Sequence, residues 1–254
     1  MGKSRIIALC GKGGVGKTSV SALLVRCLAG SEGRKVLAID ADPSAGLAAS
    51  LGVRVKKSVD DIRKDLVSRL THGRRTADPE TVRALDYELF DALSEGDGFA
   101  LLSIGRPEDE GCFCRVNSLL KDIIRDLASG FDYVLIDGEA GIEQINRRVM
   151  KEVDDLVILS DTSVKGITVA RAISKVAREN RAVDCRTIGL VLNRVRGEEE
   201  VRRISGDIDL DMYGWIPEDD SIREFDLQGR PLVSLPRESP ANRVVERLAS
   251  MFAD

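Results

Sequence analysis

Short apolar runs alternate with amphipathic segments along almost the whole chain, and the first apolar run covers residues 5–10. Runs of this kind, without regular polar alternation, are typical of strands that a parallel sheet buries on both faces. Six further runs lie at residues 35–39, 99–104, 133–136, 156–159, 188–192 and 212–216. The pattern predicts a strand at each of these places.

Helical periodicity fills the intervals between the predicted strands. After the first strand, one apolar stripe recurs at helical spacing and consists of Val20, Leu23, Leu24, Cys27 and Leu28. Similar stripes occupy residues 120–127, 170–177 and 240–248. Strands and helices that alternate in this way form βαβ units. We therefore expect an α/β fold with a mostly parallel central β-sheet and helices on both faces.

Residues 52–97 depart from this alternation because they are rich in charge and have no clear period. They predict a variable insertion built from helices and a short hairpin. A chain of 254 residues with 43% hydrophobic side chains can bury one substantial core. We therefore expect residues 1–254 to form a single domain that includes this insertion.

Charge and cysteine content narrow the class of function. The formal net charge of −4 argues against a dominant basic surface, so we expect no nucleic-acid partner. The apolar run near the start is too short for a signal peptide or a membrane span, which predicts a cytoplasmic protein with no membrane partner. Five cysteines, an odd number, suit reduced thiols or a metal site better than a set of disulfides.

A glycine-rich segment connects the first predicted strand to the first predicted helix. It consists of Gly11, Lys12, Gly13, Gly14, Val15, Gly16, Lys17 and Thr18, followed by Ser19. Placed between a strand and a helix, this is a Walker A motif, whose backbone N–H groups cradle phosphates. In such a loop Lys17 reaches the β- and γ-phosphates of ATP and the Thr18 hydroxyl binds Mg²⁺. The motif therefore predicts the fold of the P-loop NTPases, with ATP hydrolysis as the expected activity.

Lys12 is additional to what phosphate binding requires. With it, the loop resembles those of the deviant Walker A ATPases, the group of MinD, ParA, the nitrogenase iron protein and the arsenite-pump ATPases. The resemblance implies a face-to-face homodimer in which Lys12 crosses to the nucleotide of the partner subunit. There it would neutralise charge that develops during phosphoryl transfer.

Carboxylates follow two of the predicted strands. Asp40 and Asp42 come directly after residues 35–39, at the edge of an open α/β sheet where ligands bind. Asp137 ends the run 133–136 in the Walker B pattern, which places it near Mg²⁺. The same resemblance implies that Asp42 activates the attacking water, that Asp40 supports Mg²⁺, and that Asn193 contacts adenine. Residues 138–143 are similar to the second switch of MinD-like proteins.

Two cysteines, Cys112 and Cys114, are separated by one residue between a predicted strand and a predicted helix. In extended backbone such side chains point to the same side, so both thiolates could bind one metal ion. Zinc or nickel prefers four donors, and the chain has no second pair of this kind. A two-fold dimer would supply the missing pair and complete a four-cysteine site for Ni²⁺ or Zn²⁺ at its interface.

The cysteine pair sharpens the resemblance to the CooC family of ATPases, which help to insert nickel into carbon monoxide dehydrogenase. The matching residues are the loop from Gly11 to Thr18, then Cys112, Cys114, Arg115, Asn117 and Ser118, and residues 140–143. The resemblance implies a metallochaperone whose client is carbon monoxide dehydrogenase or a related nickel enzyme. Residues 137–140 depart from the family pattern, which leaves the client open.

Two other functions are compatible with the ATPase motifs. One is a spatial regulator of the MinD or ParA kind that binds a membrane or DNA. MinD needs an amphipathic membrane helix, whereas residues 243–254 end in an acidic residue and their apolar side chains are better explained by packing on the sheet. The other is an iron–sulfur reductase similar to the nitrogenase iron protein. That protein takes its cysteine ligands from two separate loops, whereas the two cysteines here are nearly adjacent.

Overall fold

The computed structural model describes residues 3–30, 33–71, 79–106, 114–138, 149, 152–179, 184–205 and 208–253. Within these residues, eight strands form one sheet in the order β3-β4-β2-β5-β1-β6-β7-β8. Every neighbouring pair is parallel except β3 and β4, which are antiparallel. The predicted α/β fold with a mostly parallel central sheet is confirmed.

The predicted strands are all present, and most are longer than their apolar runs. Their bounds are β1 Arg5–Gly11, β2 Val36–Asp40, β3 Ser94–Glu95, β4 Phe99–Ser103, β5 Tyr133–Asp137, β6 Glu152–Ser160, β7 Asp184–Val195 and β8 Asp211–Pro217. The central strands are almost fully buried; in β2, for example, every residue is buried. This burial on both faces explains why these strands read as continuous apolar runs rather than as alternating ones.

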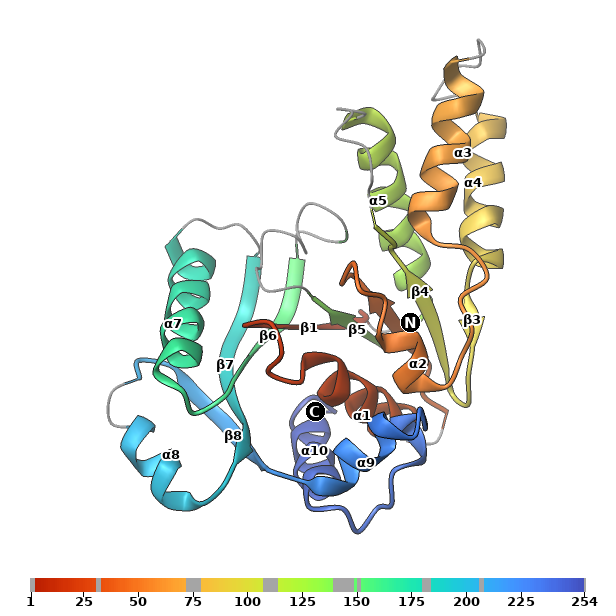
Figure 1. Cartoon of the computed structure of the whole chain (residues 1–254). Coiled ribbons are helices and arrows are strands. Elements are labelled where there is room, and N and C mark those ends of the chain that lie inside the picture. Colours follow the sequence, from red (N-terminus) through yellow and green to blue (C-terminus); the bar gives the residue numbers. More distant parts are fainter. Residues whose placement is uncertain are drawn as a thin grey trace.

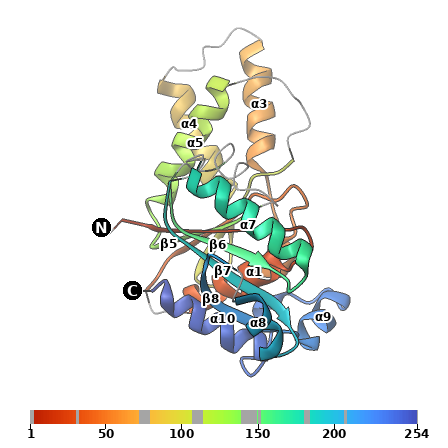
Figure 2. The same ribbon diagram turned by 90° about the vertical axis from the view of Figure 1, so that its left-hand side faces the viewer.

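Helices cover both faces of the sheet (Figures 1 and 2). One face packs against α1 (Lys17–Ala29), α2 (Leu47–Leu51), α9 (Asp220–Leu227), the 3₁₀ turn η1 (Leu232–Ser234) and α10 (Pro240–Met251). The other packs against α3 (Val59–Thr71), α4 (Pro79–Asp91), α5 (Cys114–Ala128) and α7 (Val164–Glu179), while α8 (Glu198–Ser205) lies against β7.

Alternate side chains of each strand supply the two apolar cores. In β1, Ala8 and Cys10 face the core under α3, α4, α5 and α7, whereas Ile7 and Leu9 face the core under α1 and α10. All four are completely buried. Successive side chains of a strand point to opposite faces, so one short apolar run contributes to both layers.

Residues 52–97 contain helices α3 and α4 and the short strand β3, which pairs with β4 across a tight turn. The predicted helices are therefore present, and the hairpin is formed by β3 with β4, a strand that follows this segment. Figure 1 shows α3, α4 and α5 side by side, extending beyond the sheet. Leu66 of α3 and Leu85 of α4 are buried in their common core, and Tyr87 and Phe90 of α4 are exposed.

The main local difference from the sequence-based expectation concerns α5. Its apolar stripe predicts a helix from about residue 120, but the helix begins at Cys114. Cys114 therefore has helical backbone, whereas the geometry expected for the cysteine pair assumed extended backbone; Cys112 lies outside the described residues, so the arrangement of the pair stays a prediction. Among the described helices, none combines the length and apolar character needed to cross a membrane.

Candidate functional site

The carboxyl ends of β2, β5, β1 and β6 lie next to one another in the sheet. The glycine-rich loop follows β1, and Asp40, Asp137 and Asp161 lie at or directly after the ends of β2, β5 and β6. The neighbouring strand ends therefore bring these residues together. Most of the residues that the sequence marked as candidates therefore meet at one edge of the sheet, the edge where ligands bind in open α/β folds.

The glycines of the loop after β1 have conformations and surroundings that a side chain would disturb. Gly14 and Gly16 have φ of 79° and 92°, a region that residues with a side chain rarely adopt. A Cβ on Gly11 would come within 2.1 Å of the carbonyl oxygen of Leu159 in β6, and a Cβ on Gly16 within 2.5 Å of Asn193 Nδ2. The loop therefore needs glycine at these positions for both torsional and steric reasons.

Helix α1 begins at Lys17, and no side chain caps its N-terminus. The first backbone N–H groups of a helix have no partner within the helix, so this end can bind an anion. Lys17 is buried, and its Nζ donates to the carbonyl oxygens of Gly11 (3.2 Å) and Lys12 (3.4 Å). Its amine is thus held at the loop, where it can pair with the negative charge of bound phosphates.

Asp40 and Asp137 occupy paired positions at the ends of β2 and β5, and both are completely buried. Burial raises the pKa of Asp40 to about 7, with a further contribution from the charge of Asp137. Burial likewise raises the pKa of Asp137 to about 6, opposed by the hydroxyl groups of Thr18 and Ser21. Two neighbouring carboxylates resist ionisation here because nothing nearby fully compensates their charge.

The donors at this point fit a divalent cation. Asp40 uses both its oxygens, accepting from the backbone N–H of Asp42 (3.3 Å) and Leu47 (3.1 Å). Asp137 Oδ1 accepts from Ser21 Oγ (3.0 Å), but its buried Oδ2 has no hydrogen-bond partner. An orphaned carboxylate oxygen beside a second carboxylate and the Thr18 hydroxyl can hold Mg²⁺, which is commonly bound by few protein ligands together with phosphate and water.

Asp42 lies just beyond the end of β2 and is half-buried. Its Oδ1 accepts from the backbone N–H of Ser44 (2.9 Å) and from the Ser44 hydroxyl (2.7 Å). One carboxylate oxygen is thereby oriented by the following turn. The second oxygen, Oδ2, is the one that could accept a proton from water.

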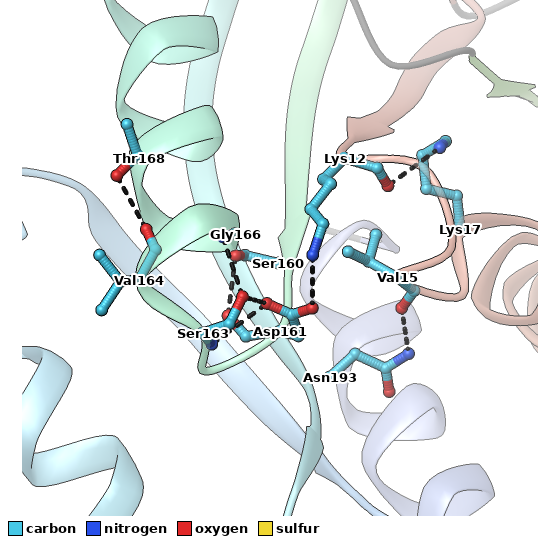
Figure 3. Close-up of polar contacts among 10 residues, drawn as sticks. All are labelled: Lys12, Val15, Lys17, Ser160, Asp161, Ser163, Val164, Gly166, Thr168 and Asn193. Carbon is cyan, nitrogen blue, oxygen red and sulfur yellow. Dashed lines mark hydrogen bonds and ion pairs between the residues drawn. The ribbon is translucent and has the colours of Figure 1, made fainter.

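Lys12 leaves the loop in a different direction from Lys17 (Figure 3). Its Nζ lies 3.1 Å from Oδ2 of Asp161, the residue that follows β6. Burial alone would raise the pKa of Asp161, but hydrogen bonds from Ser163 and Lys12 outweigh it and lower that pKa below its ordinary value. Lys12 is therefore engaged by a carboxylate of its own subunit.

Asn193, near the end of β7, packs under the loop. Its Nδ2 donates 2.7 Å to the carbonyl oxygen of Val15, and its Oδ1 accepts from the backbone N–H of Arg194 (3.0 Å). The side chain is thus part of the loop's support. The sequence predicted a contact with adenine instead, and that role stays a prediction.

Of the two candidate metal-binding cysteines, the structure describes only Cys114, so the predicted pair stays a prediction. Cys112 lies outside the described residues, and Cys114 is described only as the first residue of α5. No group of three or more His, Cys, Asp or Glu side chains suited to a metal ion occurs within the described part of the chain. The other thiols are protonated, because burial raises the pKa of Cys10 to about 12 and those of Cys27 and Cys185 to about 11.

Ser21 and Asp161 belong to the site, but neither was among the residues predicted from the sequence. Asp161 could have been predicted in the same way as Asp40, because it also directly follows an apolar strand and begins a polar segment. Ser21 could not have been predicted, because a serine inside a helix does not by itself indicate a binding site. Its position one turn after Thr18 brings it to Asp137 only in the folded chain.

This fold, with a glycine-rich anion-binding loop between β1 and α1 and buried acids at adjacent strand ends, defines a P-loop NTPase. The CobQ/CobB/MinD/ParA nucleotide binding domain family matches residues 6–232. The chain belongs to this family, and it is an ATPase.

Similar proteins cover nearly the whole chain. An uncharacterized ATP-binding protein of Methanocaldococcus jannaschii is 38% identical over 96% of this chain and 96% of its own length. The carbon monoxide dehydrogenase accessory protein CooC of Rhodospirillum rubrum is 32% identical over 93% of this chain and 91% of its own. The structure of the septum site-determining protein MinD complexed with Mg-ADP from Pyrococcus horikoshii has a TM-score of 0.70 at 27% identity, covering 98% of this chain and 95% of that one.

Proposed function

We propose that this chain is an ATP-hydrolysing metallochaperone that forms a homodimer and assists nickel insertion into carbon monoxide dehydrogenase or a related nickel enzyme. One observation carries the proposal: a chain with the ATPase loop and an additional Lys12 also contains the pair Cys112 and Cys114. Spatial regulators of the MinD or ParA kind have no need of such a pair. The 32% identity to the accessory protein CooC over most of both chains supports the same function.

For the nucleotide, the residues from Gly11 to Ser19 would surround the phosphates, with the Lys17 amine on the β- and γ-phosphates. Thr18, Asp40 and Asp137 would hold Mg²⁺, which when bound neutralises charge on the phosphates. The orphaned Oδ2 of Asp137 supports this assignment.

For hydrolysis, Asp42 would take a proton from the attacking water, and Lys12 would act on the nucleotide of the partner subunit. The half-buried position of Asp42 and its carboxylate oxygen oriented by Ser44 support the role of a base. Asn193 would hold the loop from below and lie close to the base of the nucleotide.

For the metal, Cys112 and Cys114 of two subunits would provide four thiolates for Ni²⁺ or Zn²⁺ at the dimer interface, in a reducing cytoplasm. Metal and ATP would then stabilise the same closed dimer, so each would strengthen the binding of the other. ATP hydrolysis would reopen the dimer and release the metal to the client.

The test compares wild-type protein with Cys112→Ser/Cys114→Ser by metal analysis and by oligomer mass, with and without ATP. We expect about one metal ion per dimer in the wild type, lost in the double variant while ATP binding survives. Cys27→Ser/Cys185→Ser is the matched control, because it removes two thiols that burial keeps protonated, and it should retain the metal. Equal metal content in the wild type and Cys112→Ser/Cys114→Ser would overturn the metallochaperone function.

The second candidate is a spatial regulator of the MinD or ParA kind, favoured by the TM-score of 0.70 to the archaeal MinD structure. Sedimentation with anionic lipid vesicles or with DNA in the presence of ATP distinguishes it, since a metallochaperone should remain in the supernatant. An iron–sulfur reductase would instead give brown, anaerobically purified protein with a visible absorption band.

A further inference from the structure

The ion pair between Lys12 and Asp161 joins two loops that are 149 residues apart in the sequence (Figure 3). The Lys12 and Asp161 side chains are 28% and 31% exposed, so the pair lies at the surface of the site and not in the core. A partly exposed pair of this kind can orient a lysine and is weak enough to be exchanged for another anion.

The position of the Asp161 carboxylate is determined by the start of α7. Its Oδ1 accepts from the backbone N–H of Ser163 (3.1 Å) and from the Ser163 hydroxyl. The Ser163 Oγ in turn accepts from the backbone N–H of Gly166 (3.0 Å). Figure 3 shows this set of contacts on one side of Asp161 and Lys12 on the other.

Gly166 makes room for this arrangement. A Cβ on Gly166 would lie 2.1 Å from Asp161 Oδ1 and 2.8 Å from Ser160 Oγ. The space that glycine leaves open at this position is occupied by the Asp161 carboxylate and the Ser160 hydroxyl, so a larger residue would displace one of them. The turn thus leaves space for a carboxylate whose second oxygen, Oδ2, accepts from Lys12.

We propose that Asp161 is a positioning residue that holds the Lys12 amine on its own subunit until the phosphates of a partner's nucleotide replace the carboxylate. This inference rests on the proposed dimer in which Lys12 acts in trans. The Lys12 ammonium is paired with an anion before and after this exchange, first with the Asp161 carboxylate and then with the phosphates. Formation of the closed dimer therefore requires a nucleotide with enough negative charge to displace Asp161, so a dimer without nucleotide is disfavoured.

The first experiment uses the nucleotide-free protein and does not depend on dimer formation. An amine-reactive anhydride is added at low dose, and the modification rate of Lys12 is measured by mass spectrometry of the peptide. Asp161→Asn keeps the oxygen that accepts from Ser163 and replaces Oδ2 by an amide, which removes the partner of Lys12. We expect Lys12 to react about 2- to 5-fold faster in this variant, the range set by the strength of partly exposed ion pairs.

The second experiment measures the dimer dissociation constant with Mg²⁺ and a non-hydrolysable ATP analogue. Each dimer must break two Lys12–Asp161 pairs, so the effect enters twice. We expect Asp161→Asn to tighten the dimer by about 4- to 25-fold. In a Lys12→Gln background the same substitution should change nothing, whereas a merely structural role at the start of α7 would persist there.

Gly166→Ala provides an independent variant that keeps the charge. The added methyl group displaces the carboxylate while alanine favours the helix, so faster labelling of Lys12 and a tighter dimer are expected again. Asp209→Asn is the matched control, because it removes an exposed carboxylate that pairs with Arg178 of α7. It should behave as the wild type in both experiments.

The outcomes separate this inference from the proposed function. Unchanged labelling of Lys12 in both Asp161→Asn and Gly166→Ala would overturn the inference and leave the proposed dimer intact. A looser dimer in Asp161→Asn would also overturn it. Faster labelling of Lys12 in Asp161→Asn, found together with a wild-type protein that stays monomeric with the analogue and metal, would instead overturn the proposed dimer and the exchange that depends on it.

Discussion

The Asn193 side chain donates a hydrogen bond of 2.7 Å to the carbonyl oxygen of Val15, across 178 residues of sequence (Figure 3). Val15 and Asn193 are buried, and the next residue, Arg194, has an unusual φ of 58°. Residues held in such conformations persist where the surrounding structure determines them. The end of β7 therefore holds the glycine-rich loop in place through the contact of Asn193 with Val15.

Asn193→Ala should weaken ATP and GTP binding by similar factors. The variant leaves the buried carbonyl of Val15 without a donor, which costs about 1–3 kcal/mol and disfavours the loop conformation that either nucleotide needs. Fluorescence titration with both nucleotides measures this. Asn193→Asp also lacks the donor and should show the same loss. A loss confined to ATP would indicate that Asn193 acts on adenine and not on the loop.

Gly16→Ala should lower the free energy of unfolding by about 1–3 kcal/mol in the absence of nucleotide. The φ of 92° is strained for alanine, and its Cβ would lie 2.5 Å from Asn193 Nδ2. Gly13→Ala is the control within the same loop, since a Cβ at Gly13 meets nothing within 4 Å. Urea denaturation of both variants checks the difference. Equal stabilities would show that the loop is free to rearrange.

Without Mg²⁺, the free energy of unfolding should fall as the pH rises from about 4 to 7. Burial raises the pKa of Asp40 to about 7 and that of Asp137 to about 6, whereas an unfolded Asp titrates near ~3.9. In this interval the folded chain binds more protons than the unfolded one, so deprotonation favours unfolding. Mg²⁺ with ADP should reverse the slope, because a cation favours the ionised carboxylates.

Calorimetry in EDTA at several pH values tests this dependence. Asp137→Asn cannot ionise, so its melting temperature above pH 6 should exceed that of the wild type by roughly 2–4 °C per kcal/mol of relieved burial penalty. Asp209→Asn, which removes an exposed carboxylate, should follow the wild type. A wild-type slope unchanged by Asp137→Asn would mean that other groups cause the pH dependence.

Asp42→Asn should bind ATP normally and hydrolyse it about 10²- to 10⁴-fold more slowly, which is the usual contribution of a general base. An amide oxygen can still accept from Ser44, so the turn after β2 is preserved while the basic group is lost. Phosphate release and ATP binding are measured on the same preparation. Normal turnover in this variant would exclude Asp42 as the base.

Local patterns were sufficient for much of this protein. The apolar runs predicted each long strand, because burial on both faces leaves a continuous hydrophobic signature. The segment from Gly11 to Ser19 could be predicted because consecutive residues form its anion-binding loop, which depends little on distant contacts. Asp40 and Asp137 were found for a related reason: each directly follows an apolar strand.

Only the tertiary structure decided which distant residues meet. The strand order places β1 between β5 and β6, so it sets the loop beside Asp137 on one side and Asp161 on the other. The contacts of Ser21 with Asp137 and of Lys12 with Asp161 join residues 116 and 149 positions apart. No periodicity encodes such pairs. They arise because parallel strands far apart in the sequence pack side by side and their carboxyl ends must share one edge of the sheet.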